Sequence, residues 1–314
     1  MSNKILFLYL TKRQKSEFEK CEKILKTIFR KFRRSVIFSY LQADISPSCL
    51  QLFRRRLYEE MQNNDVCFIS GDITYSEKDI IIRNILGEYT EAHFLKGCSI
   101  CHPPSAFNVI NDDEKVTLMH TAMREHFKKA VDVAITLSLE RKRKLTVCTD
   151  SGMGSFIKDA LSDGFDKSLH IKTEQLTFEE ALLICMNSVP TFDVVLTSEH
   201  IASFLKMHIG YTGNLGALYF PDGFSIFYTE KGKVYTRQTF PFEQINNTPI
   251  HSTIISFSAI LEKEFAMKSA SEWLKRTATV AFETHHDAPT DSYVEKVISE
   301  IEKPMRKHYS EVRK

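Results

Sequence analysis

The chain has 314 residues, of which 43% are hydrophobic and 26% are charged, a composition typical of a globular protein with a sizeable core and about two domains or lobes. Its 42 basic and 40 acidic side chains leave a formal charge of only +2. This balance gives no general electrostatic reason to expect nucleic acid or an acidic membrane surface as a partner.

The first apolar run, Ile5–Leu10, is too short to act as a signal sequence or to span a membrane. The charged residues Lys12 and Arg13 follow it almost at once. The seven cysteines are odd in number and scattered along the chain, which indicates reduced thiols rather than a disulfide framework. We therefore expect a cytoplasmic protein that has neither a membrane nor a nucleic acid as its partner.

The N-terminal part of the chain alternates predicted strands with predicted helices. Ile5–Leu10, Val36–Tyr40 and Asp65–Ser70 are short runs of apolar and β-branched residues, which are typical of buried strands. Ser46 and Pro47 favour the N-terminus of the second helix. The first helix has apolar residues spaced three and four apart, which predicts a buried face formed by Phe18, Cys21, Ile24, Leu25, Ile28, Phe29 and Phe32.

The rest of the chain continues this alternation of strands and helices. The predicted elements are a helix over Thr121–Arg143, strands over Leu145–Thr149 and Phe192–Thr197, a helix after Thr197, a hairpin over 224–235 with its turn at 230–232, and a helix over Ile254–Phe265. A last helix follows Thr290, which is a typical N-cap residue.

Phe192–Thr197 (FDVVLT), the helix after it and the turn Thr212–Gly216 (TGNLG) follow one another in an order that resembles the isocitrate and isopropylmalate dehydrogenase family. In that family, a DVIVT-like strand leads into a helix with metal-binding aspartates and then into a TGSLG-like turn. The resemblance implies an α/β protein with a two-lobed isopropylmalate-dehydrogenase-like fold, in which helices flank a mixed sheet. It also implies a larger lobe formed by 1–97 and 214–314 and a smaller lobe, with the dimer interface, formed by 98–213.

The metal-binding positions of the family are changed in this chain. The two aspartates of the family's helix correspond to Ser203 and Met207. The third aspartate, which the neighbouring subunit donates in the family, corresponds to Glu179. A cation of the magnesium type needs several oxygen ligands, and Glu179 supplies one carboxylate. Glu179 is therefore a lone candidate metal ligand, and the alternative is an ordinary residue of a helix surface or an interface.

The segment Ile82–Phe94 resembles the family's LRKELGLYANLRP segment, in which two arginines hold the substrate carboxylate. Arg83 and Tyr89 keep the residue types of the family, whereas Glu91 replaces an asparagine and His93 replaces the second arginine. Arg83 can still hold a carboxylate or a phosphate through a bidentate pair. The alternative is a surface or structural arginine, because its expected partners are gone.

The groups that carry proton transfer and cofactor binding in the family differ as well. Asp150 is retained, but Ser151 replaces the family's lysine, and a serine cannot act as a cationic acid or base of that reach. The family's glycine loop corresponds to Tyr9–Ser16, which contains no glycine and cannot bring its backbone as close to a ligand. The histidine–glycine signature that wraps the nicotinamide cofactor is absent after Gly223.

Cys98, Cys101 and His102 match the C-x-x-C-H spacing of c-type haem attachment. Attachment of that kind requires an exported chain, so we interpret the match as a coincidence. The alternative is a zinc site, although no second paired-ligand motif accompanies these residues. Its further ligands would come from Cys67, His120 or Cys148.

The metal ligands, the lysine, the glycine loop and the cofactor signature have all changed together, whereas a change of substrate alone would keep the metal and cofactor sites. We therefore expect a non-catalytic homologue without a metal or nicotinamide cofactor. Such a protein would act in regulation, as a scaffold, or as a binder of a small carboxylate in the cleft where the family binds its substrate. Its expected partner is a second copy of the chain or a homologous subunit.

The alternative is an active enzyme on the same fold. One version has a reorganised chemistry that needs no metal and uses Arg83, Tyr89, His93, Asp150 and Glu179. The other version retains dehydrogenation of a hydroxy acid with NAD(P) and Mg²⁺. Metal-dependent binding of the nucleotide distinguishes this last version from the others.

Overall fold

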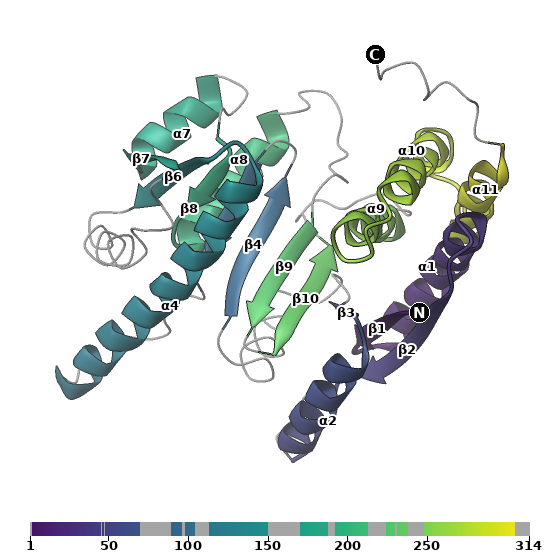
Figure 1. Cartoon of the computed structure of the whole chain (residues 1–314), viewed down its shortest axis with the longest axis horizontal. Helices are drawn as coiled ribbons and strands as arrows, with labels where there is room; N and C mark the ends of the chain where they lie inside the picture. The colour runs from purple at the N-terminus through teal and green to yellow at the C-terminus, as the bar shows by residue number, and fades with distance from the viewer. Residues whose placement is uncertain are drawn as a thin grey trace.

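The computed structural model describes residues 2–44, 46, 48–69, 89–95, 98–103, 113–149, 170–187, 192–212, 224–229, 231–237 and 248–304. In this part of the chain, a ten-stranded sheet has helices on both of its faces (Figure 1). The strands are β1 (Asn3–Tyr9), β2 (Val36–Gln42), β3 (Val66–Ile69), β4 (Tyr89–Leu95), β5 (Cys98–His102), β6 (Lys144–Thr149), β7 (Lys172–Thr177), β8 (Val194–Leu196), β9 (Phe224–Thr229) and β10 (Gly232–Arg237). The helices are α1 (Lys12–Lys31), α2 (Leu50–Asn63), α4 (Asp113–Glu140), α7 (Phe178–Asn187), α8 (Glu199–Thr212), α9 (Thr248–Lys263), α10 (Lys268–His285) and α11 (Thr290–Glu302).

The sheet is mixed, as predicted, and its strand order is β2-β1-β3-β10-β9-β4-β5-β8-β6-β7. Strands at both ends pair in parallel, whereas β10, β9, β4 and β5 form an antiparallel centre. The predicted hairpin of β9 and β10 is confirmed, and it lies between β3 and β4. Segments far apart in the sequence therefore build the centre of the sheet.

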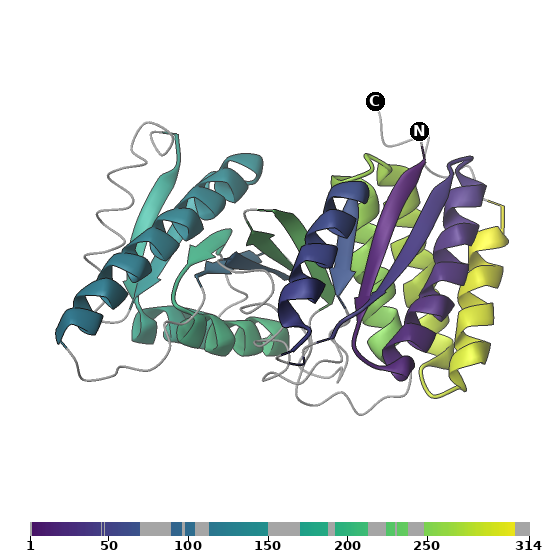
Figure 2. The ribbon, with the colours of Figure 1, turned by 90° about the horizontal axis from the view of Figure 1, so that it is seen from below.

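Helix α1 buries the face that its apolar spacing predicts. Phe18, Cys21, Ile24 and Leu25 are all buried, and the helix packs against α9, α10 and α11. Figure 2 shows α1 beside α11 at one end of the molecule, while α4 lies at the other end. The apolar spacing therefore set the orientation of α1, because only one of its faces can be removed from water by the sheet and its neighbouring helices.

Each face of the sheet carries its own apolar core. The face toward α1, α4 and α9 has one large cluster, which includes Phe7, Phe68 and Val147. The opposite face has two clusters. The α2 cluster contains Leu6, Leu8, Phe53, Leu57, Tyr89 and Phe227. The α8 cluster contains Cys98, Ile100, Val195, Ile201 and Leu205.

Several boundaries differ from the predictions. Helix α4 begins at Asp113 rather than Thr121 and ends at Glu140, and the positive φ of 58° at Arg143 belongs to the turn after it. Helix α2 begins at Leu50, because the Ser46 carbonyl accepts the N–H groups of Cys49 and Leu50 in a turn before the helix.

Thr290 also differs from its predicted role, since it is the first residue of α11 and Pro289 is the N-cap. Strand β7 was not predicted, because it is an edge strand whose side chains are mostly polar and exposed. In the part of the chain that the structure describes, no helix is long and apolar enough to cross a membrane. The lobe limits 1–97 with 214–314 and 98–213 stay a prediction.

Candidate functional site

Strand β4 lies at the centre of the sheet and carries two polar side chains between the two clusters of one face. Side chains alternate along a strand, so Tyr89, Glu91, His93 and Leu95 point to the same face. Tyr89 belongs to the α2 cluster, and Leu95 packs against the α8 cluster. Glu91 and His93 therefore lie where the apolar packing of this face is interrupted.

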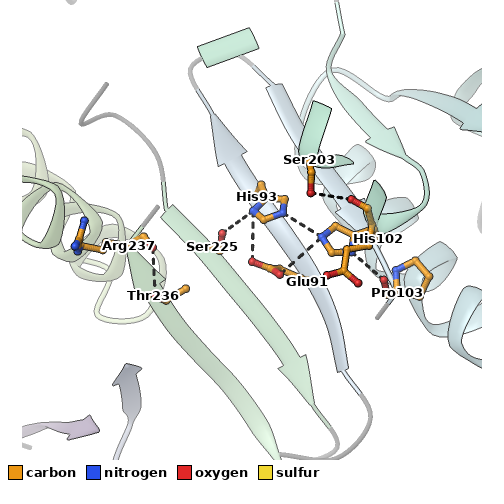
Figure 3. Close-up of polar contacts among 9 residues, drawn as sticks. Glu91, His93, His102, Pro103, Ser203, Ser225, Thr236 and Arg237 are labelled. Atoms are coloured by element: carbon orange, nitrogen blue, oxygen red, sulfur yellow. Dashed lines mark hydrogen bonds and ion pairs between the residues drawn. The ribbon is translucent and has the colours of Figure 1, made fainter. Parts of the chain in front are cut away.

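The register of the sheet brings two further polar residues to this point. Glu91 lies opposite His102 of β5, and His93 lies opposite Ser225 of β9. Figure 3 shows the side chains of Glu91, His93 and His102 pointing toward one another, with Ser225 beside His93. We call Glu91, His93, His102 and Ser225 the histidine cluster.

The members of the histidine cluster lie within hydrogen-bonding or ion-pairing distance of one another. His93 Nε2 lies 3.0 Å from His102 Nε2, and His93 Nδ1 lies 2.7 Å from Ser225 Oγ. The Glu91 carboxylate lies 3.5 Å from His93 Nδ1 and 3.7 Å from His102 Nε2. Glu91 is only 6% exposed and the other three residues are no more than 4% exposed, so the cluster is closed to solvent.

The proton positions in the cluster follow from one acceptor. The Pro103 carbonyl accepts a hydrogen bond from His102 Nδ1 at 2.8 Å, so that nitrogen carries the proton. In the neutral ring, His102 Nε2 then has a free lone pair and accepts from His93 Nε2. Two unprotonated ring nitrogens therefore face the Glu91 carboxylate. Imidazole nitrogens and a carboxylate in this arrangement are groups that bind metal ions.

The buried hydroxyl of Thr197, which follows β8, continues the line of polar residues across the sheet. Strand β5 pairs with β8 in a register that joins Cys101 to Leu196, and the N–H of Thr197 continues the ladder by donating to Cys101 O at 3.0 Å. This register sets Thr197 beside His102. Thr197 is 0% exposed, and its Oγ1 has no hydrogen-bond partner among the residues that the structure describes.

The structure gives Tyr89 a packing role. Its ring lies edge-on to Phe227 with centroids 5.4 Å apart, inside the α2 cluster. His93, in contrast, belongs to the histidine cluster, whereas the sequence indicated it as a substitute for a substrate arginine and as a candidate group for a reorganised chemistry. Arg83, Asp150 and Ser151 lie outside the described residues.

The candidate metal ligands of the family do not form a metal site in the described residues. Glu179 is exposed in the first turn of α7. The Ser203 hydroxyl donates to the Glu199 carbonyl of its own helix at 3.0 Å, in the common i to i−4 pattern of helical serines. The side chain of Met207 lies outside the description, but a thioether is a poor ligand for a hard cation.

The C-x-x-C-H match is divided between the two faces of the sheet. Cys98 lies in the α8 cluster, whereas Cys101 belongs to the large cluster of the opposite face. The two thiols therefore cannot bind one haem or one zinc ion, which corrects the zinc hypothesis for this pair. Burial also raises the pKa of the Cys98 thiol to about 12, so it stays protonated at neutral pH. Only His102 of this motif takes part in a polar site.

The N-terminal loop satisfies its own backbone. Gln14 Oε1 accepts the N–H groups of Leu10 and Thr11 at 2.7 and 3.1 Å, and Thr11 Oγ1 accepts the N–H of Gln14 at 3.2 Å. This is a capping box at the start of α1. The backbone donors that a glycine loop would offer to a cofactor are therefore bound to a side chain of the chain itself.

Solved structures share this fold at low sequence identity. A β-decarboxylating dehydrogenase of Thermococcus kodakarensis in its apo form has a TM-score of 0.67 and 12% identity, and 96% of each chain is covered. The chain therefore has the fold of a β-decarboxylating dehydrogenase. A chain from the peripheral stalk of the Euglena gracilis mitochondrial ATP synthase has a TM-score of 0.64 and 10% identity, over 96% of this chain and 100% of that one.

The sequence matches no family model and no curated protein. At identities of 10 and 12%, the structural likeness concerns the fold alone. The cofactor and metal that the dehydrogenase fold implies are a nicotinamide nucleotide and a magnesium-type ion. The capped loop at Thr11 and the hydroxyl of Ser203 do not fit these groups.

Sequence reasoning missed the partners of His93. The alternation of Glu91 and His93 in an otherwise apolar strand was a signal that polar groups share one face. The pairing of β4 with β5 and β9 brings His102 and Ser225 to them, and no local pattern of residues predicts that pairing.

Proposed function

We propose that this chain is a non-catalytic protein with the dehydrogenase fold, which serves as a scaffolding or regulatory subunit and does not carry out metal- and NAD-dependent oxidative decarboxylation. The observation that carries the proposal is the identity of the residues at the metal-binding positions of helix α8. The resemblance assigns metal-binding aspartates to two of its positions, and Ser203 and Met207 stand there instead. The Ser203 hydroxyl is used within the helix, where it donates to Glu199 O.

The histidine cluster supports the same proposal. His93 stands where the resemblance assigns a substrate-binding arginine, and it is buried against Ser225 and His102 rather than directed into open space. An arginine in a cleft offers a fixed fork of donors to a carboxylate, whereas this imidazole has both ring nitrogens engaged by the protein.

A structural role is consistent with the second solved structure. A chain of the peripheral stalk of an ATP synthase has this fold over its whole length, so the fold occurs in a large assembly as well as in a dehydrogenase. By analogy, the partner of this chain would be a second copy or a homologous subunit, with the dimer interface on the smaller lobe.

The test is the thermal stability of the purified chain with NAD, NADP, ATP, Mg²⁺ and a panel of hydroxy-dicarboxylates, singly and in combination. A ligand at a hundred times its dissociation constant adds about 2.7 kcal/mol to the free energy of unfolding. We expect no shift with nucleotide plus Mg²⁺. A shift with NAD or NADP that requires Mg²⁺, accompanied by reduction of the nucleotide, would overturn the proposal and favour the active dehydrogenase.

A further inference from the structure

We propose that Glu91, His93 and His102 form a buried structural site for a divalent transition-metal ion of the Zn²⁺ type. The three residues offer two imidazole nitrogens and a carboxylate, and their ligand atoms lie within 4.8 Å of one another. Zn²⁺ commonly takes this combination of ligands. The inference is independent of the proposed function, because it uses none of the positions that the resemblance assigns to metal binding.

The distances between the ligand atoms are close to those of a metal site for two of the three pairs. Tetrahedral Zn²⁺ with Zn–N distances of about 2.0–2.1 Å separates two ligand atoms by about 3.3–3.4 Å. The two Nε2 atoms are 3.0 Å apart, and a Glu91 oxygen is 3.7 Å from His102 Nε2. All three ligand atoms lie within 4.8 Å of one another, so rotation of the Glu91 and histidine side chains toward a common centre would convert the hydrogen-bonded cluster into a ligand set.

The outer hydrogen bonds are those of metal-binding histidines. Such a histidine generally donates its second ring N–H to a carbonyl, a carboxylate or another fixed acceptor, which sets its tautomer and its orientation. His102 already donates from Nδ1 to Pro103 O. His93 has Ser225 Oγ at 2.7 Å from Nδ1, so a shift of its proton from Nε2 to Nδ1 frees Nε2 for the metal.

Thr197 provides a second, independent observation. Its hydroxyl is fully buried, it has no hydrogen-bond partner in the described part of the chain, and the strand register sets it beside His102. Leaving a buried hydroxyl without a partner is unfavourable. A metal-bound water in the fourth position would give this hydroxyl a partner and complete a four-coordinate site.

The position of the site indicates a structural role. Its ligands come from β4 and β5, Ser225 comes from β9, and the site separates the α2 cluster from the α8 cluster. All members are buried, so no substrate reaches the ion, and the role is structural although a water rather than a fourth side chain completes the coordination. Metal bound there would join the two apolar halves of this face.

The experiment uses the full chain after treatment with a chelator and removal of that chelator. ZnCl₂ is titrated in competition with a chromophoric chelator, CoCl₂ is added separately to follow its visible absorption, and MgCl₂ serves as the hard-cation comparison. No nucleotide is present, so the outcome does not depend on the test of the proposed function. We expect one Zn²⁺ or Co²⁺ per chain, a higher Tm with either ion, and no effect of MgCl₂.

Variants in the site locate the binding. His93→Gln and His102→Gln should lose the stoichiometric binding, and Ser225→Ala should weaken it about 10–100-fold, as expected for an outer-shell group. His251→Gln is the matched control, because His251 is equally buried but bonds Tyr293 between helices.

Circular dichroism identifies variants that fail to fold. The titration of the wild-type protein tests whether the metal binds at all, and it does not depend on these variants. Folded wild-type protein that binds no Zn²⁺ or Co²⁺ would overturn the proposal and indicate a proton shared within the cluster. Binding that survives in both folded histidine variants would overturn it as well.

Discussion

Replacing Arg141 by alanine is expected to destabilise the protein more than replacing its partner Asp193. Asp193 has a side chain that is 1% exposed, and its two oxygens accept from Arg141 Nε and from the N–H of Lys142, each at 2.8 Å. Arg141 also donates to Ser99 Oγ at 3.1 Å, and its side chain is 28% exposed. The pair therefore joins the end of α4 to β5 and to the start of β8, but only the carboxylate is fully desolvated.

This difference in exposure sets the expected magnitudes. Arg141→Ala leaves a buried carboxylate whose remaining donor among the described residues is the Lys142 N–H. It should cost about 3–5 kcal/mol, the range for breaking a buried ion pair from one side. Asp193→Ala leaves a guanidinium that can turn toward water, so it should cost about 2–3 kcal/mol, mainly for unmade hydrogen bonds. The double variant should cost less than the sum, with a coupling of about 1–3 kcal/mol.

The assay is urea denaturation followed by the fluorescence of Trp273, the single tryptophan of the chain. The matched control is the ion pair of Arg55 and Glu59, whose side chains are 82% and 60% exposed and whose coupling should stay below about 1 kcal/mol. Equal costs for Arg141→Ala and Asp193→Ala, or additive costs in the double variant, would refute the argument from exposure.

Three further predictions concern a buried histidine, a helix cap and the exposure of the cysteines. Burial, and then the charge of Lys275, lower the pKa of His251 from 6.5 to about 3, so below pH 6.5 the unfolded chain binds a proton that the folded chain does not. The free energy of unfolding should therefore decrease by up to about 1.4 kcal/mol for each unit by which the pH is lowered from 6.5 toward 3. His251→Gln should flatten a plot of Tm against pH, and an unchanged slope would contradict this explanation. Gln14→Ala should cost about 1 kcal/mol in urea denaturation through loss of the capping box, and the exposed Gln62→Ala should cost nothing measurable. Cys49 should react first with a thiol reagent, because it is the one cysteine that is not buried, and Cys49→Ser should abolish the fast phase; a fast phase that persists would contradict the burial of the others.

The succession of elements was readable from the sequence. Apolar spacing identified the buried face of α1, and short β-branched runs identified β1, β2 and β8. The hairpin of β9 and β10 was predicted from its turn. These features depend on local periodicity, which one segment carries by itself. The predicted helix starts were less accurate where they depended on an N-cap side chain, as at Ser46 and Thr290. In both places backbone hydrogen bonds form the first turn, and the predicted side chain does not cap it.

The sequence by itself therefore determined the fold class and the substitutions at Ser203 and Met207, since both can be read from residue types in order. The tertiary structure alone decided which polar residues meet. His93 contacts Ser225, which is 132 positions away in the sequence, and this contact exists only because the hairpin of β9 and β10 enters the sheet beside β4. Local propensity does not encode that pairing. It depends on how all the strands bury their apolar faces together, and it converts scattered residues into one closed cluster.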